Sequence, residues 1–151
     1  DLFVIFTRAN ADPGGRAING AIDRFLSEHP GRACAFHALG LLRYLSVMAC
    51  CEAVVGNSSS GIIEAPTLGV PTLNLGTRQE GRVRAASVRD CGTDRESIGA
   101  LLDQLGTGKL RRGPVDNPYD GGDTSAKTAL LLKGWLDRGL GPKRFNDLEG
   151  R

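Results

Sequence analysis

The 151-residue sequence contains few of the residues that mark metal-binding or disulfide-rich proteins. It has two histidines and four cysteines, and aromatic residues make up 5% of the chain. Cys50 and Cys51 are adjacent and no Cys-x-x-Cys pair occurs, a spacing that argues against a zinc site or a disulfide framework. Apolar neighbours predict buried, reduced thiols in a cytoplasmic protein. No Asp/Glu/His cluster has ligand spacing, so we expect no metal and no cofactor.

The net charge is also low, and the apolar runs are short. A formal charge of +2 is too small to predict binding to nucleic acid or to a membrane surface. No signal peptide is evident, and no apolar run approaches the roughly 18 residues of a membrane span. With 40% hydrophobic and 24% charged residues, the composition is typical of one soluble domain with its own core.

An initiator methionine is absent, since Met48 is the only methionine and the chain opens on an apolar strand. This opening favours an excised domain of a longer polypeptide, and a processed full-length protein is the alternative. We expect one nucleotide-binding domain over 1–138 and a loosely held tail over 139–151, which is rich in glycine and basic residues.

Apolar runs of strand and helix type alternate along the chain. Strands are predicted at 2–7, 33–37, 53–55, 70–75 and 85–90, and helices at 16–28, 39–50, 62–68, 95–105 and 124–136. The first strand is apolar throughout, as in strands buried on both faces. Such alternation predicts an α/β fold with a doubly wound, mainly parallel, Rossmann-like sheet. Ligands bind such sheets at the carboxyl ends of the strands.

A serine-rich turn follows the third predicted strand, with the sequence Gly-Asn-Ser-Ser-Ser-Gly at 56–61. Small residues before a helix let a phosphate approach free backbone N–H groups, and hydroxyls add further donors. The turn therefore favours a diphosphate site over a ligand-free serine cap, for which one serine is sufficient. The candidate ligands are Ser58 and Ser59, with Ser60 and Gly61 as a second tier.

Charged residues in three loops extend this candidate site. Glu64 lies one turn into the following helix, where it can accept hydrogen bonds from a ribose diol or simply compensate the helix dipole. Arg78 and Arg82 belong to an arginine-rich loop after the fourth strand, which suits phosphate or is a solvated basic loop. Asn10 and Arg16 follow the first strand and either face ligand or form a turn and a helix start.

Four long motifs together resemble the hydrolysing UDP-N-acetylglucosamine 2-epimerases of sialic-acid-type sugar synthesis. They occupy 6–14, 56–66, 71–82 and 117–122, in the order found in that family, and the likeness spans nearly the whole chain. The non-hydrolysing epimerases typically carry Thr-Asp-Ser-Gly-Gly where this chain has Asn-Ser-Ser-Ser-Gly at 57–61.

The resemblance implies the UDP-binding, C-terminal half of a two-domain fold like that of GT-B glycosyltransferases. It implies that Ser58 and Ser59 contact the diphosphate, Glu64 the ribose and Arg78 the nucleotide, with Asn10 lining the cleft. By the same resemblance, the two residues that flank the uracil are Ala38 and Leu39.

The family reaction eliminates UDP and then adds water, giving N-acetylmannosamine and UDP. The resemblance places its proton-transferring carboxylates in the N-terminal domain, so no catalytic residue is assigned here and the chain alone is expected to be inactive. The expected partners are that domain, a UDP-sugar and further copies of the full-length protein.

Three other interpretations stay open. In the first, the chain is half of a GT-B glycosyltransferase. In the second, it is half of an epimerase acting on a UDP- or GDP-linked diacetamido sugar, and in the third it is a non-catalytic nucleotide-binding module.

Overall fold

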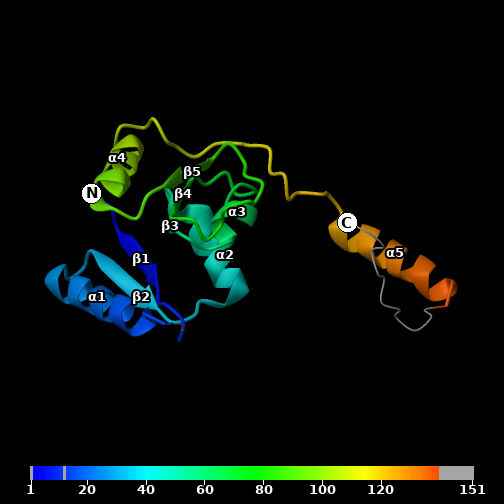
Figure 1. Ribbon diagram of the computed structural model, residues 1–151, viewed down its shortest axis with the longest axis horizontal. Coiled ribbons are helices and arrows are strands. Elements are labelled where there is room, and N and C mark those ends of the chain that lie inside the picture. Colours follow the sequence, from blue (N-terminus) through cyan, green and yellow to red (C-terminus); the bar gives the residue numbers. More distant parts are fainter. Residues whose placement is uncertain (1, 12, 140–151) are drawn as a thin grey trace, which may run out of the picture.

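The computed structural model describes residues 2–11 and 13–139. Strands and helices alternate through most of this part, as the apolar pattern predicts (Figure 1). The elements are β1 (Val4–Thr7), α1 (Gly15–Glu28), β2 (Ala33–Phe36), α2 (Gly40–Cys50), β3 (Val54–Gly56), α3 (Ser60–Ile63), β4 (Thr72–Leu75), β5 (Val88–Cys91), α4 (Arg95–Gly106) and α5 (Thr124–Asp137).

All strand pairings in the described part are parallel, which confirms the predicted α/β fold class. β1 pairs with β2 in one two-stranded sheet, and β3, β4 and β5 form a second sheet in that order. Because parallel strands need long crossovers, each pair is joined through a helix or an extended connection. The carboxyl ends of β3 and β4 therefore lie at the same edge of the second sheet, in the register Gly56↔Asn74.

The core lies around β4, the middle strand of the second sheet. Leu73 of β4 and Val70 just before it are 0% exposed, as is Ile62 of α3. Met48 of α2 and Ala65 pack with Val70 in the same cluster. Fully burying a valine, leucine or isoleucine stabilises by about 1.5–3 kcal/mol, so this region holds the segment after β3 firmly against β4.

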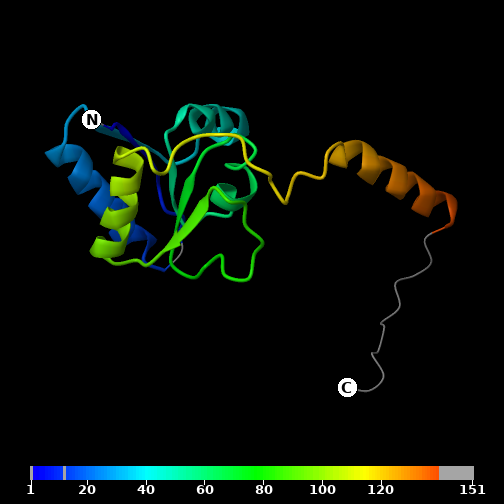
Figure 2. The ribbon, with the colours of Figure 1, turned by 90° about the horizontal axis from the view of Figure 1, so that it is seen from above.

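The helix α5 stands away from the rest of the protein in both ribbon views, at the end of the extended segment that follows α4 (Figures 1 and 2). Its side chains are exposed, including Leu130 at 74% and Trp135 at 58%. The predicted domain boundary at residue 138 stays a prediction. The predicted tail 139–151 lies outside the described residues, apart from residue 139.

The prediction that the first strand is buried on both faces is wrong. Leu2 and Phe3 are each 56% exposed, and the burial of β1 alternates, with Ile5 at 38%. The physical reason is that β1 pairs only with β2 within the described residues, so part of its apolar surface is uncovered.

The cysteines are free, as predicted, but they are not buried. Cys50 is exposed, and Cys34, Cys51 and Cys91 are half-buried. Partial burial raises the pKa of the Cys51 thiol, with the neighbouring Cys50 as a smaller cause. Adjacent residues of a strand or a helix do not share a face, so apolar neighbours in the sequence do not by themselves bury a thiol.

The amino end of α4 is capped by Asp94. The Asp94 carboxylate accepts a hydrogen bond from the Ser97 N–H at 2.8 Å and from the Ser97 hydroxyl at 2.7 Å. These bonds to Ser97 lower the pKa of Asp94 below its usual 3.8. A depressed folded-state pKa means that the stabilisation is complete above the unfolded pKa and is lost as the pH falls through the folded value.

We expect Asp94→Ala to lower the melting temperature at pH 7 and to have little effect at about pH 2. Asp94→Asn keeps a capping oxygen that does not titrate, so it should differ from Asp94→Ala at both pH values. Thermal unfolding followed by circular dichroism across this range measures the effect. A loss for Asp94→Ala that does not change with pH would contradict the assignment of the cap.

Candidate nucleotide-binding site

The serine-rich turn leads from β3 into α3 and leaves backbone donors open. Gly61 N–H bonds the Ser58 carbonyl at 3.2 Å, and Ile62 N–H bonds the Ser59 carbonyl at 2.9 Å. In the described part of the chain, no acceptor bonds the N–H groups of Ser58 or Ser59. Two adjacent N–H groups beside two hydroxyls make a set of donors suited to phosphate oxygens.

The helix after this turn is shorter than the predicted span 62–68. α3 covers Ser60–Ile63, and turns continue to Gly69. Pro66 has no N–H to continue an α-helical ladder, and a turn bond from Gly69 N–H to its carbonyl follows at 2.9 Å. A helix of one turn has a small macrodipole, so the donors at the turn act mainly as individual groups.

Gly61 fixes the turn against the central strand. The Thr72 hydroxyl donates to the Gly61 carbonyl at 2.7 Å, and Thr72 is 2% exposed. A Cβ at Gly61 would lie 2.6 Å from the Thr72 methyl carbon, closer than real Cβ contacts allow. The absence of a side chain at Gly61 therefore lets the turn approach β4, and the hydrogen bond from Thr72 holds the turn in place.

The third serine of the turn is engaged within the protein. The hydroxyl groups of Ser60 and Tyr44 of α2 are 2.8 Å apart and share a hydrogen bond. In the same turn, the Ser58 hydroxyl accepts from the Ser60 N–H at 3.3 Å. This arrangement favours Ser60 as a residue that orients the turn and leaves Ser58 and Ser59 as the better candidates for contact with a ligand.

The loop after β4 lies against the serine-rich turn. The Gln79 side-chain amide donates to the Asn57 carbonyl at 2.8 Å, and Gln79 is 5% exposed. Arg78 remains exposed and donates to the Asn57 side-chain oxygen at 3.4 Å. The structure thus brings Arg78 beside Ser58, although 21 residues separate Arg78 from Asn57 in sequence. Asn57 and Gln79 join the serine-rich turn to the loop after β4. Neither is among the site residues that the sequence predicts.

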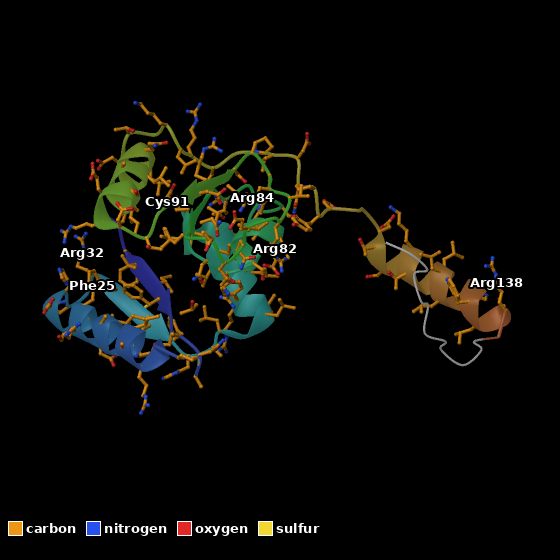
Figure 3. The ribbon with its side chains drawn as sticks, in the orientation of Figure 1. Phe25, Arg32, Arg82, Arg84, Cys91 and Arg138 are labelled. Carbon is orange, nitrogen blue, oxygen red and sulfur yellow. The ribbon has the colours of Figure 1, made fainter. Side chains whose placement is uncertain are left out.

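The other two arginines of this loop have different surroundings (Figure 3). Arg84 donates to the carbonyls of Gln79 at 3.1 Å and Arg82 at 3.2 Å, and pairs with Asp90 of β5 at 3.1 Å. The Arg82 side chain is exposed. Arg84 therefore braces the loop, and Arg78 is the arginine whose guanidinium contacts the serine-rich turn.

Glu64 lies at the end of α3, half-buried. Its Oε2 atom is shielded from solvent and has no hydrogen-bond partner among the described residues. A buried carboxylate oxygen without a donor is costly, by about 1–3 kcal/mol or more for a charged group. Such an atom is suited to accept a hydrogen bond from a ligand hydroxyl.

The segment 117–119 ties α3 to the loop after β4. The Asn117 side-chain amide donates to the Ile63 carbonyl at 2.8 Å and to the Thr67 hydroxyl at 2.7 Å. The Tyr119 hydroxyl donates to the Val83 carbonyl at 3.0 Å. One of the four motifs of the sequence thus connects the two segments that carry Glu64 and Arg78.

The first loop forms a second cluster at the carboxyl ends of β1 and β2. The register Thr7↔Phe36 sets the loops that follow these strands side by side. Asn10, Arg16 and His37 line an open pocket of about 560 Å³. A Cβ at Gly15 would lie 2.2 Å from the Asn10 carbonyl oxygen, so this turn also depends on a glycine.

The two residues predicted to flank uracil directly follow His37. Ala38 is exposed and Leu39 is half-buried at the start of α2. Within residues 2–11 and 13–139, no hydrogen bond joins this first cluster to the serine-rich turn. The predicted site residues thus form two groups, each internally close.

Among the residues that the structure describes, neither a metal-binding cluster nor a membrane-spanning helix is found. No group of three or more His, Cys, Asp or Glu side chains is placed to hold a metal ion. No helix in the same part of the chain is long and apolar enough to cross a membrane.

Comparison with known proteins decides the family. The UDP-N-acetylglucosamine 2-epimerase family matches residues 1–133. The chain belongs to this family. The predicted resemblance is therefore confirmed, and the parallel α/β architecture agrees with it.

Relatives within the family differ in their named substrates. A GDP/UDP-N,N'-diacetylbacillosamine 2-epimerase (hydrolyzing) of Campylobacter jejuni is 42% identical over 58% of this chain and 23% of its own length. A UDP-N,N'-diacetylbacillosamine 2-epimerase (hydrolyzing) of Legionella pneumophila is 32% identical over 88% of this chain and 34% of its own. A UDP-N-acetylglucosamine 2-epimerase of Neisseria meningitidis is 30% identical over 83% of this chain and 32% of its own. The chain thus spans 23% to 34% of the length of these curated relatives.

Gly61→Ala tests the contact between the serine-rich turn and β4. The added methyl must displace Thr72 or the turn, so we expect a loss of about 1–3 kcal/mol in the free energy of unfolding. Gly99→Ala is the matched control, because a Cβ at this position of α4 has no atom within 4 Å. That control should be neutral or stabilising by up to about 1 kcal/mol. Equal behaviour of the two variants in urea unfolding would argue against tight packing at Gly61.

Proposed function

We propose that this chain binds the UDP part of a nucleotide sugar and is the nucleotide-binding half of a hydrolysing UDP-N-acetylglucosamine 2-epimerase. The reaction of the whole enzyme would convert UDP-N-acetylglucosamine and water to N-acetylmannosamine and UDP. The observation that carries the proposal is the meeting of Arg78 and Gln79 with Asn57, directly beside Ser58 and Ser59. The family match supports the substrate class.

In this proposal the diphosphate binds at the serine-rich turn. The N–H groups and hydroxyls of Ser58 and Ser59 donate to its oxygens, and Gly61 lets the turn adopt this position. Arg78 is exposed and already beside the turn, so its guanidinium can close over the diphosphate. These donors would also stabilise the negative charge that develops when UDP leaves the sugar, which lowers the barrier to elimination.

Glu64 is the proposed ribose ligand. Two vicinal ribose hydroxyls can donate to one carboxylate, and the Oε2 atom of Glu64 is buried without a donor among the described residues. Binding a ribose there would satisfy that atom. A glutamate that only compensated the helix dipole would lie at the amino end of the helix, whereas Glu64 follows the last residue of α3.

The first cluster completes the proposed site. Asn10 would line the cleft toward the sugar, with Arg16 beside it in the same pocket. Ala38 and Leu39, which follow the pocket residue His37, would flank the uracil. Arg82, exposed at the end of the arginine-rich loop, and Ser60 and Gly61 complete the second tier of candidates.

A diacetamido sugar is the second candidate substrate. Two of the relatives are named as N,N'-diacetylbacillosamine 2-epimerases, one of them at 42% identity. The contacts proposed in this chain are with the nucleotide, whereas most contacts with the sugar would come from residues outside this chain. The family match argues against the alternative of a glycosyltransferase half.

Catalysis requires groups that this chain does not supply under the proposal. General acid–base catalysis needs a group within hydrogen-bond reach of the proton, and the resemblance assigns those carboxylates to an N-terminal domain. The isolated chain is therefore expected to be inactive and the full-length enzyme to act as a homo-oligomer without a metal or cofactor. Four cysteines without a disulfide suit the cytoplasm.

The first test is UDP binding by the chain itself. Titration with UDP at up to millimolar concentration should shift the backbone amide resonances at 58–61 in NMR spectra, because these groups would face the diphosphate. The amides at 101–106, in the second half of α4, serve as the internal control, because only the start of this helix lies at the carboxyl edge of the sheet. Unchanged resonances at 58–61 in a folded protein would refute the proposal.

The second test is Arg78→Ala. Losing a hydrogen bond to a charged group should weaken UDP binding by roughly 1.5–3 kcal/mol. Arg24→Ala, at an exposed arginine in the second half of α1, is the matched control and should leave the affinity unchanged. Isothermal titration calorimetry on both variants measures the difference. Equal affinities would remove Arg78 from the site.

A further inference from the structure

The segment 117–119 contacts both halves of the proposed nucleotide site at once. Asn117 holds the Ile63 carbonyl at the end of α3, and Tyr119 holds the Val83 carbonyl in the loop after β4. The two residues are also joined to each other, because the Tyr119 N–H donates to the Asn117 side-chain oxygen at 3.0 Å. The segment is therefore a single bridge between two parts of the chain that lie 20 residues apart in sequence.

Each end of this bridge lies next to a proposed ligand contact. The carbonyl held by Asn117 belongs to the residue directly before Glu64. The carbonyl held by Tyr119 belongs to the residue between Arg82 and Arg84, in the loop that presents Arg78. Displacing either carbonyl would move the corresponding ligand contact, since the backbone between them is short.

We infer that Asn117 and Tyr119 are positioning residues for nucleotide binding, an inference that rests on the proposed function. Asn117 orients Glu64 toward the ribose through α3, and Tyr119 holds the arginine-rich loop so that Arg78 stays over the diphosphate. The two actions are separate, because each side chain bonds a different segment.

The surroundings of the bridge favour this role over general support of the fold. Tyr119 is 38% exposed, and the buried cluster of Met48, Ala65 and Val70 does not include it. A hydrogen bond of an exposed side chain contributes little to global stability, because water replaces it when it is lost. Its loss does free the local backbone, and ordering that backbone again on binding lowers the affinity for the ligand.

The experiment compares UDP and 2′-deoxy-UDP binding by calorimetry to the wild-type chain, Tyr119→Phe and Asn117→Ala. Both variants should bind UDP roughly fivefold to thirtyfold more weakly, the effect of reordering about one residue. Asn117→Ala should also reduce the preference for UDP over 2′-deoxy-UDP, because the ribose contact is lost. Tyr119→Phe should keep that preference. Thr107→Val, which removes a hydroxyl bonded to a carbonyl at the end of α4, is the control and should change neither value.

Double variants separate positioning from a diffuse structural effect. Tyr119→Phe should lose most of its effect in an Arg78→Ala background, and Asn117→Ala should lose its effect on the ribose preference in a Glu64→Gln background. Tyr119→Phe removes one oxygen atom and keeps the ring, so it remains informative if Asn117→Ala does not fold.

The outcomes distinguish the two proposals. Wild-type protein that fails to bind UDP would overturn the proposed function and this inference with it. Wild-type binding with unchanged affinities in both variants, or effects that simply add to those of Arg78→Ala and Glu64→Gln, would overturn the inference and leave the proposed function intact.

Discussion

The candidate site depends on one hydrogen bond between two loops. The Gln79 amide donates to the Asn57 carbonyl at 2.8 Å, where Gln79 is almost fully buried. Leaving the amide group of this buried side chain without an acceptor would be costly, so the two loops are held in one relative position. Arg78 follows from that position, because it precedes Gln79 and is exposed. The hydrogen bond from Arg78 to the Asn57 side-chain oxygen joins the same two loops, but it is longer, at 3.4 Å, and lies at the exposed surface.

The central strand β4 connects this contact to the core. Its polar side chains are buried, so they bond to neighbouring segments. Thr72 donates to the Gly61 carbonyl at 2.7 Å, and Asn74 donates to Asp90 of β5 at 2.6 Å. Asp90 also pairs with Arg84, which braces the arginine-rich loop. A chain of polar contacts therefore runs from the serine-rich turn through β4 and β5 to the loop that carries Arg78.

Sequence patterns predicted the order and type of the elements well and their surroundings less well. The alternation of apolar runs predicted the parallel α/β class and the order of its strands and helices. The predictions that the first strand and the cysteines are buried were wrong, because the exposure of a side chain depends on which segments pack against it in the folded chain. The third helix ends at Ile63 and not at Leu68, and Pro66 in the turns that follow cannot continue the backbone ladder.

The sequence by itself determined the family and indicated the residues proposed to bind a nucleotide, because both depend on the chemistry of short motifs. Only the tertiary structure decided how those residues divide their work. Ser60 shares a hydrogen bond with Tyr44, Arg84 pairs with Asp90, and Asn117 donates to the Ile63 carbonyl. The residues proposed to bind a ligand are then Ser58, Ser59, Glu64 and Arg78. The partners of Ser60 and Asn117 are 16 and 54 residues away in sequence, so they cannot be found from local patterns, because their distance is set by strand register and packing.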